Sequence, residues 1–451
     1  MSLSKLSVNK LKSIIFGADK APLFGEKIMV QTTAAVICGE KDVQLRTFDL
    51  PPIGDNELLV KNISNSICLS TYKAALLGSN HKRVPDNIDQ VPVMTGHEYA
   101  GIIVEVGSNL RDQYHPGQPF VLQPAMGLPS GYSAGYSYET FGGNATYSII
   151  PKIAIELGCV LPYNSDYFAN ASLAEPMSCI IGAYHASYHT TPYVYEHQMG
   201  IKQGGSLALL ACAGPMGIGA IDYAINGPVK PSLIVVTDID SQRLARAESL
   251  ISTQSAKQQG ITLHYVNTAE LDDPVSYLKQ LNDGNGYDDV MVYAAVQQVL
   301  EQADELLGND GCLNFFAGPT DKQFKVPFNF YNVHYESTHI VGTSGGSTGD
   351  MIESIELSEQ SKINPSFMIT HVGGLEAAPH TILNQLDIPG GKKLIYPHIN
   401  LPLTAIDDFR SLADVDPFFI ELDAILAANN YVWNQHAEKA LLEYYDVSLT
   451  V

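Results

Sequence analysis

The sequence predicts an α/β protein of two domains, one mostly β and one built on a doubly wound parallel sheet. Its 451 residues exceed the size at which a single hydrophobic core stops growing, about 250 to 300 residues. From Val30 to about Ile150, short β-rich runs are separated by Gly and Pro, which is typical of a mostly β domain. After Glu175, apolar strands and helices alternate, and this alternation indicates a parallel sheet.

The first residues, 1–28, have weak periodicity and are predicted to form an N-terminal arm. The β-rich runs that follow include 57–60 and 100–106, and a loop rich in Gly, Tyr and Ser is predicted over 127–147. The alternating strands and helices of the parallel-sheet part are predicted, in order, at 206–212, 216–226, 233–237, 241–251, 289–293, 311–316, 340–342 and 347–357.

The last part of the chain departs from the alternating pattern. Residues 363–397 have mixed character, and residues 401–451 are predicted to be helical. The parallel-sheet domain is therefore predicted to be inserted into the first domain. The predicted boundaries are 186–361 for the parallel-sheet domain and 29–185 together with 362–451 for the mostly β domain.

The charge excludes two classes of partner. The formal net charge is −22 and the pI is near 4.8, so nucleic acid and anionic membranes would be repelled. The longest apolar stretch, Leu207–Ile221, contains Gly and Pro and is shorter than the roughly 20 residues that span a bilayer. No membrane segment is expected.

The cysteines and the N-terminus indicate the compartment. The lysines near the N-terminus are not followed by a secretory apolar region. The six cysteines are scattered singly, without the pairing pattern of a secreted disulfide framework. The sequence therefore predicts a protein of the reducing cytoplasm.

Four residues form a candidate metal site: Cys68, the adjacent pair His97 and Glu98, and Glu175. Thiolate, imidazole and carboxylate together suit a catalytic zinc ion, which uses three protein ligands and keeps one position open. Their wide separation argues against a local structural zinc module. A single Cys is usually a small buried hydrophobe and a single His is often part of a core, so only the combination favours a metal.

A glycine-containing turn follows the apolar run at residue 207. Cys212 replaces the first glycine of the dinucleotide-binding fingerprint, while Gly214 and Gly217 keep the close phosphate approach and the helix packing. Gly219 is expected to aid helix packing. The residues predicted to bind the pyrophosphate at a helix N-terminus are Cys212, Gly214, Pro215, Met216 and Gly217.

Asp238 ends the next predicted strand, where a carboxylate accepts hydrogen bonds from the adenosine ribose. This carboxylate favours NAD(H), because it would repel the extra phosphate of NADP(H). Arg243 nearby keeps NADP(H) as the alternative cofactor. In the structural alternative, Asp238 is only a turn residue before a helix that Asp240 or Ser241 caps.

A local cationic group occurs in this otherwise acidic chain, between the first two ligand segments. In one interpretation, the group binds a phosphate in a pocket shielded from water. In the other, it is only a solvated surface loop, and the sequence leaves both interpretations open. The group comprises Lys73, His81, Lys82 and Arg83.

Other charged residues are predicted to have no functional role. Lys392 and Lys393 precede an apolar strand and are predicted to lie at a solvated edge. His185 and His189 are predicted to lie in one helix, where a core or surface role is favoured over a second metal site. His334 and His339 have no interpretable partner.

The motifs together resemble the zinc-dependent medium-chain dehydrogenase/reductase family, over almost the whole chain from Met29. The Glu-Pro pair is similar to the polyol dehydrogenase branch. The residues that carry this resemblance are Cys68-Leu-Ser70, Gly96-His-Glu-Tyr-Ala-Gly101, Glu175-Pro176 and Cys212-Ala-Gly-Pro-Met-Gly217. Two shorter segments resemble L-sorbose 1-phosphate reductases, namely His81-Lys-Arg-Val-Pro85 and Leu401-Pro-Leu-Thr-Ala-Ile-Asp-Asp-Phe409.

The resemblance implies a GroES-like catalytic domain, a Rossmann domain and one catalytic zinc. It implies that Cys68 and His97 are ligands and that Glu175 is the third, directly or through water, with Glu98 close enough to exchange. It also implies that Ser70 relays the substrate proton. The four-cysteine structural zinc lobe of the family is missing.

One position departs from the family. Many members carry an acidic residue where this chain has Thr71, so the contacts that hold the ligands are expected to differ. The difference concerns the support of the metal site, because the ligand residue types themselves match.

The expected function is hydride transfer between a nicotinamide cofactor and a small sugar or polyol phosphate. The specific expectation is the interconversion of L-sorbose 1-phosphate and D-glucitol 6-phosphate. The alternatives are dehydrogenation of an unphosphorylated polyol or secondary alcohol, and a non-catalytic dinucleotide-binding protein. By the resemblance, the protein is expected to form a homodimer or homotetramer.

Overall fold

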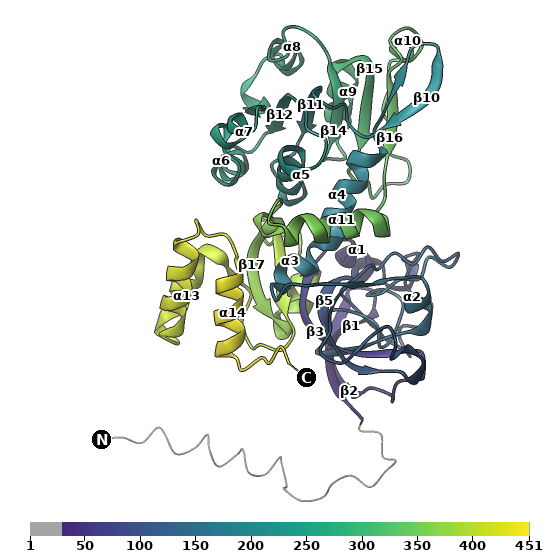
Figure 1. Ribbon diagram of the computed structural model, residues 1–451, viewed down its shortest axis with the longest axis vertical. Helices are drawn as coiled ribbons and strands as arrows, with labels where there is room; N and C mark the ends of the chain where they lie inside the picture. Colours follow the sequence, from purple (N-terminus) through teal and green to yellow (C-terminus); the bar gives the residue numbers. More distant parts are fainter. Residues whose placement is uncertain (1–28, 451) are drawn as a thin grey trace, which may run out of the picture.

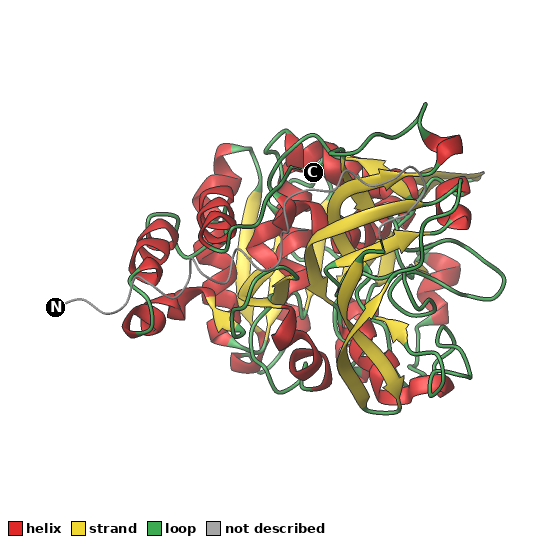
Figure 2. Ribbon diagram, turned by 90° about the horizontal axis from the view of Figure 1, so that it is seen from below, coloured by secondary structure: helices red, strands yellow, loops and turns green. Residues whose placement is uncertain are grey.

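Residues 29–450 are described by the computed structural model, which contains two large β-sheets in separate halves of the molecule (Figure 1). The predicted N-terminal arm, residues 1–28, lies outside the described residues. Viewed from below, helices flank the strands and long loops gather on one side of the molecule (Figure 2). The α/β class with a mostly β part and a parallel-sheet part is confirmed.

The larger sheet has eight strands, in the order β19-β17-β18-β3-β5-β6-β8, with β7 paired to β3. Its central strand, β3, is buried along nearly its whole length. Strands β17 to β19 join this sheet although the chain has passed through the parallel sheet before reaching them. The strands are β3 (Leu58–Ile67), β5 (Glu98–Val106), β6 (Pro119–Leu122), β7 (Tyr147–Ile150), β8 (Val160–Pro162), β17 (Ile369–Gly374), β18 (Lys392–Tyr396) and β19 (Thr404–Ala405).

A three-stranded antiparallel sheet completes the mostly β half. It consists of β1 (Gln31–Gly39), β2 (Asp42–Asp49) and β4 (Val93–Met94), in the order β2-β1-β4. Short helices and 3-10 turns connect the strands of this half. They are α1 (Leu69–Leu77), η1 (Gly78–Asn80), η2 (Ser108–Leu110), α2 (Lys152–Glu156), α3 (Phe168–Ser172), η4 (Pro365–Met368), η5 (Leu375–Ala377) and α12 (Ala378–Leu383).

The second large sheet has six strands, all parallel, in the order β13-β12-β11-β14-β15-β16. The strand order reverses between β11 and β14, and such a switch point is where doubly wound sheets bind ligands. The strands are β11 (Ser206–Leu210), β12 (Leu233–Asp238), β13 (Thr262–Asn267), β14 (Tyr287–Val292), β15 (Leu307–Phe315) and β16 (His339–Gly342). The connecting helices are α5 (Pro215–Asn226), α6 (Ser241–Leu250), α7 (Thr253–Gln258), η3 (Thr268–Glu270), α8 (Pro274–Gln280) and α9 (Gln297–Leu306).

Two packed helices, α4 (Ala174–Ala186) and α11 (Thr348–Glu359), lie between the two sheets (Figure 1). The first carries Glu175 in its first turn, and the second returns the chain to the larger sheet. The predicted domain boundaries near residues 185 and 361 stay a prediction. A hairpin of β9 (Tyr188–Thr191) and β10 (Val194–Met199) and the short helix α10 (Phe330–Tyr335) lie beside β16.

The C-terminal part is helical, with η6 (Ile406–Asp414), α13 (Phe418–Ala427) and α14 (Gln435–Tyr444). The buried carboxylate of Glu438 links α14 to α3 and to β18. It accepts hydrogen bonds from the backbone N–H groups of Phe168 at 2.6 Å and Ala169 at 2.8 Å, and from the Tyr396 hydroxyl. These contacts hold the start of α3, directly before the helix that carries Glu175.

Two details of the sequence prediction were wrong. Lys392 and Lys393 do not lie at a solvated edge, because both are buried in β18 with exposed fractions of 7% and 2%. His189 is not in a helix with His185, since α4 ends at Ala186 and His189 lies in β9. Among residues 29–450, none of the helices combines the length and the apolar character that a membrane crossing requires.

Candidate active site

The candidate ligands come from one end of two neighbouring strands. Strand β3 ends just before Cys68, which is the N-cap of α1, and β5 begins just after His97. The register of the two strands pairs Ser66 with Glu98. Antiparallel pairing therefore brings Cys68 to His97 and Glu98, although many residues separate them in the chain.

Ligand atoms of Cys68, His97 and Glu98 all lie within 4.8 Å of one another. Sulfur, imidazole nitrogen and carboxylate oxygen at this spacing fit a zinc ion. Burial, and then the charge of Glu98, raise the pKa of Cys68 to about 12. Burial lowers the pKa of His97 to about 4, so its ring is neutral, as a metal ligand must be. A divalent cation would stabilise the thiolate that burial disfavours.

Glu98 is fully buried and forms an ion pair with Lys392. The lysine Nζ lies 2.6 Å from Oε1 and 2.8 Å from Oε2 of the carboxylate, and the Ser66 hydroxyl also donates to Oε2. Burial opposes ionisation, but the charge of Lys392 holds the pKa of Glu98 below its usual range. The carboxylate is therefore ionised and already occupied by a buried cation.

Glu175 lies outside the group of mutually close ligand atoms. Its Oε1 accepts a hydrogen bond from the thiol of Cys179 at 3.8 Å. Burial, and then the charge of Glu98, raise the pKa of Glu175 to about 8. The carboxyl group is thus near enough to interact with Glu98, and a nearby cation would favour its ionised form.

Hydroxyl groups surround the His97 ring. Thr71 Oγ1 lies 3.3 Å from Nδ1, so this hydroxyl orients the ring at the position where the resemblance implied a difference. Ser70 Oγ donates to Cys68 Sγ at 3.0 Å and lies 2.7 Å from Tyr136 Oη. Tyr136 Oη is 3.3 Å from His97 Nε2. Ser70 and Tyr136 thus form a short chain of exchangeable protons beside the candidate ligands.

The predicted cationic group lies next to Tyr136. The Arg83 guanidinium is 5.1 Å from the centre of the Tyr136 ring. The His81 ring stacks on the Tyr136 ring, with 5.9 Å between the two ring centres. Lys73 Nζ donates to the Gly318 carbonyl at 3.3 Å. Burial, followed by the charges of Arg83, Lys82 and Lys73, lowers the pKa of His81.

These cations lack anionic partners. Within the described part of the chain, Lys73, Lys82 and Arg83 form no ion pair with a carboxylate. Arg83 is half-buried, whereas Lys82 is exposed. An unpaired, half-buried guanidinium one ring away from the candidate ligands can receive an anionic group of a bound substrate.

The glycine-containing turn connects β11 to α5. No side chain caps the N-terminus of α5, so its first N–H groups are open to a phosphate. A Cβ at Gly217 would lie 1.9 Å from the Cys212 carbonyl oxygen, so only glycine fits there. A Cβ at Gly214 would meet nothing within 4 Å, which leaves room for a ligand. A Cβ at Gly219 would contact Ile180 at 2.8 Å, so this residue serves helix packing, as predicted.

Asp238 supports the turn and ends β12. Its Oδ2 accepts from the Ala213 N–H at 3.2 Å, and its Oδ1 accepts from the N–H groups of Ile239 and Asp240. Asp240 caps α6 and also lies 3.6 Å from the exposed Arg243. The carboxylate that the sequence assigns to the ribose is thus held beside the glycine-containing turn.

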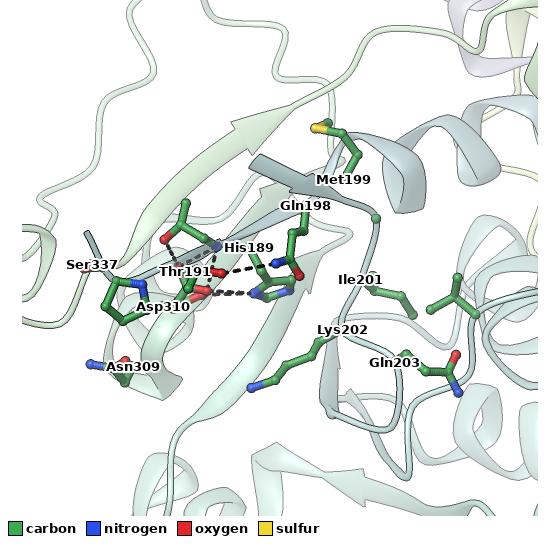
Figure 3. A pocket seen from close by; sticks show the side chains of 14 residues that line it. His189, Thr191, Gln198, Met199, Ile201, Lys202, Gln203, Asn309, Asp310 and Ser337 are labelled. Atoms are coloured by element: carbon green, nitrogen blue, oxygen red, sulfur yellow. Dashed lines mark hydrogen bonds and ion pairs between the residues drawn. The ribbon is translucent and has the colours of Figure 1, made fainter. Parts of the chain in front are cut away.

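The remaining histidines belong to other contacts. His185 lies 2.7 Å from Asp350 and His189 lies 3.2 Å from Asp289, so the two rings serve different partners. His189 and Asp310 line a cavity of about 550 Å³ beside the β9–β10 hairpin (Figure 3). None of the predicted catalytic or cofactor residues lines this cavity. His339 contacts the Tyr188 carbonyl and stacks on its ring.

Two residues of the site were missed from the sequence. The sequence predicts Lys392 to be an edge residue because no local pattern distinguishes it from a surface lysine. Tyr136 lies in the Gly- and Tyr-rich loop, where only the excess of aromatic residues could have drawn attention to it. Both act on residues remote in the chain.

Comparisons with known proteins give a consistent result. The chain matches the family described as zinc-binding dehydrogenase over residues 215–360 and the alcohol dehydrogenase GroES-like domain over residues 54–157. It is 84% identical to a mannitol-1-phosphate 5-dehydrogenase of Aliivibrio fischeri, over 94% of this chain and 100% of that protein. It is 41% identical to an L-sorbose 1-phosphate reductase of Klebsiella pneumoniae, over 92% of this chain and 98% of that protein.

Solved structures share the fold. A 2R,3R-butanediol dehydrogenase from Bacillus subtilis matches with a TM-score of 0.66 and 18% identity, over 81% of this chain and 99% of that chain. A zinc-binding dehydrogenase from Sinorhizobium meliloti bound to NADP matches with a TM-score of 0.65 and 20% identity, over 82% of this chain and 100% of that chain. At these identities the likeness concerns the fold alone.

Proposed function

This chain belongs to the zinc-binding dehydrogenases with a GroES-like alcohol dehydrogenase domain, and we propose that it interconverts a polyol phosphate and a keto-sugar phosphate. The family is one of zinc- and nicotinamide-dependent enzymes, so the non-catalytic alternative is set aside. The observation that carries the proposal is the unpaired cation Arg83, one aromatic ring away from the donor cluster of Cys68, His97 and Glu98. An unphosphorylated polyol would leave this cation without a partner.

Two phosphorylated substrates are favoured by the relatives. The 84% identical relative is named for mannitol 1-phosphate, and the 41% identical relative for L-sorbose 1-phosphate. We place oxidation of mannitol 1-phosphate at carbon 5 first, because identity is higher. The interconversion of L-sorbose 1-phosphate and D-glucitol 6-phosphate is second. The two candidate substrates differ in the number of carbons between the phosphate and the reacting carbon. A single pocket should therefore prefer one of the two substrates.

The proposed mechanism uses the residues around His97. When bound, zinc supplies a Lewis acid that lowers the pKa of the substrate hydroxyl. Ser70 and Tyr136, 2.7 Å apart, then carry the hydroxyl proton away from the buried site. Thr71 keeps the His97 ring in place, and Glu175 is assigned as the third ligand. One zinc per chain is proposed, since the cysteines of a structural zinc lobe are missing.

NAD(H) is the proposed cofactor. Asp238 holds a carboxylate at the end of β12, next to the turn that would receive the pyrophosphate. Arg243, the residue that could bind the extra phosphate of NADP(H), lies 3.6 Å from the Asp240 carboxylate. The Asp238 carboxylate beside the turn, with Arg243 paired to another carboxylate, disfavours a second phosphate there.

Initial rates with matched substrates test the proposed function. Mannitol 1-phosphate, glucitol 6-phosphate, mannitol and glucitol would each be assayed with NAD and with NADP, before and after removal of metal by a chelator. We expect turnover of a phosphorylated polyol with NAD. Its kcat/KM should be at least ~10-fold higher than that of the corresponding free polyol. Chelation should abolish this turnover, and added zinc should restore it. Equal rates for free and phosphorylated polyols would contradict the phosphate proposal.

A homo-oligomer is also proposed. Strand β16 ends the parallel sheet, and its Ile340 is 50% exposed. Exposed apolar residues adjoin this edge and define the hairpin surface: Tyr193, Tyr195, Met199, Phe330, Tyr331 and Tyr335. Helix α10 and strands β10 and β16, which carry most of this surface, lie at the same corner of the molecule (Figure 1). An open strand edge with an apolar surround is a pairing site for a second copy.

Light scattering across a dilution series tests the hairpin surface. The protein is expected to be a dimer or tetramer, and Ile340→Lys should shift it to smaller species because a charge interrupts the pairing edge. Val415→Lys is the matched control, since Val415 is an 81% exposed residue outside this surface. A monomeric protein at every concentration would contradict the proposal.

A cytoplasmic location is proposed as well. All six cysteines are free thiols, which agrees with a reducing compartment.

A further inference from the structure

A buried ion pair joins β18, one of the strands that enter the larger sheet after the parallel sheet, to the candidate metal site. Lys392 at the start of β18 and Glu98 at the start of β5 have exposed fractions of 7% and 0%. The Nζ atom donates to both carboxylate oxygens, at 2.6 Å and 2.8 Å. Lys392 is not a candidate ligand, a proton carrier or a cofactor residue, so its burial at this site has another cause.

Strand register explains how Lys392 reaches the site. Strand β18 pairs with β3, with Lys393 opposite Ile67, so Lys392 lies one residue further, at the level of Cys68. On the other side of β3, Glu98 is opposite Ser66. The ion pair therefore crosses the end of β3 where the candidate ligands lie. The Glu98 carboxylate is beside these ligands and is paired with Lys392.

Charge balance gives the pair a specific role. A buried site with thiolate Cys68 and carboxylates Glu98 and Glu175 carries three negative charges. A zinc ion and Lys392 together supply three positive charges, so the site is neutral only when both are present. Without Lys392, Glu98 would be an uncompensated buried carboxylate within 4.8 Å of two zinc ligands, and zinc would be its nearest cation.

We propose that Lys392 is a positioning residue that holds Glu98 in an ion pair and thereby withholds it from the zinc. The proposal rests on the proposed function, because it takes the zinc site as given. Withholding Glu98 keeps one coordination position open, and catalytic zinc sites need such a position for the substrate. Without Lys392, Glu98 would bind the zinc as a further protein ligand and fill the open position.

Cobalt substitution of the full-length protein tests this role without relying on turnover. The visible bands of cobalt(II) depend on the ligands, and imidazole is a probe for an open position. The variants are Lys392→Met, which removes the charge, and Lys392→Arg, which keeps it. Lys393→Met is the matched control, because Lys393 is a buried lysine of the same strand whose Nζ donates to the Ile388 carbonyl at 2.9 Å.

In the unsubstituted protein, imidazole is expected to shift the cobalt bands. In Lys392→Met the bands should already differ, and imidazole affinity should fall by at least ~10-fold, in line with the effect of outer partners on metal sites. Lys392→Arg and Lys393→Met should behave as the unsubstituted protein does. Unchanged bands and imidazole affinity in Lys392→Met would overturn the role of Lys392 alone. An unsubstituted protein that binds no cobalt would overturn the proposed function and this role together.

A double variant covers the case in which Lys392→Met does not fold. Removing one partner of a buried pair is strongly destabilising, whereas replacing both with neutral residues is often tolerated. Glu98→Gln combined with Lys392→Met should therefore fold, bind one cobalt and keep its response to imidazole. Loss of cobalt from the folded double variant would show that Glu98 is a required ligand, and would overturn the proposal.

Discussion

Replacing Cys68 with alanine is expected to remove the bound zinc and the turnover together. Cys68 supplies the only sulfur among the mutually close ligand atoms, at the N-cap of α1. Loss of an outer partner of a metal ligand costs about 10- to 100-fold in affinity or activity, so loss of a ligand should exceed ~100-fold. Metal analysis and initial rates on the same preparation measure both effects.

Cys159→Ala is the control for this variant. Cys159 is a buried free thiol in the core of the same half of the molecule. It does not belong to the cluster of close donor atoms, which consists of Cys68, His97 and Glu98. It should retain zinc and turnover. Turnover by a Cys68→Ala preparation verified to be free of zinc would reject the metal role.

Replacing Arg83 with alanine is expected to reduce kcat/KM for the phosphorylated polyol by about 10- to 100-fold, mainly through KM. This range corresponds to the loss of a hydrogen bond to a charged group, about 1.5 to 3 kcal/mol. The free polyol has no phosphate, so its kcat/KM should change much less. The measured quantity is the ratio of the two effects, which cancels any general disturbance of Tyr136 beneath the guanidinium.

Two further variants define the cause of this effect. Arg83→Lys keeps the charge and should recover part of the discrimination, although lysine lacks the planar two-point contact of arginine. Arg111→Ala removes an exposed arginine elsewhere in the same domain and should leave both substrates unaffected. If Arg83→Ala impairs phosphorylated and free polyols equally, the cationic group is not a phosphate site.

Much of the fold could be predicted because its signals are local. The strand–glycine turn–helix from β11 to α5 follows from apolar runs and from Gly217, where a side chain would collide with the Cys212 carbonyl. The parallel sheet follows from the alternation of strands and helices. Strand β13 and helices α7, α8 and α9 were not predicted. Helices α7 and α8 are only six and seven residues long, too short for a clear helical period, whereas α9 is amphipathic and could have been predicted.

The candidate ligands could be named from residue type, but their partners could not. Cys68, His97, Glu98 and Glu175 stand out because thiolate, imidazole and carboxylate have few common uses together. Whether Glu98 is free or paired depends on Lys392, which is 294 residues away in the chain. Nothing around Lys392 in the sequence distinguishes it from a solvated lysine.

By itself, the sequence determined the class of fold, the types of the candidate donor atoms and the position of the glycine-containing turn, since each depends on neighbouring residues. Only the tertiary structure decided that Lys392 is buried against Glu98 and that Arg83 lies over Tyr136. Those contacts follow from the order and register of strands in the larger sheet and from the path of the long loop. Such an arrangement is set by the packing of the whole domain, and no local pattern of residues encodes it.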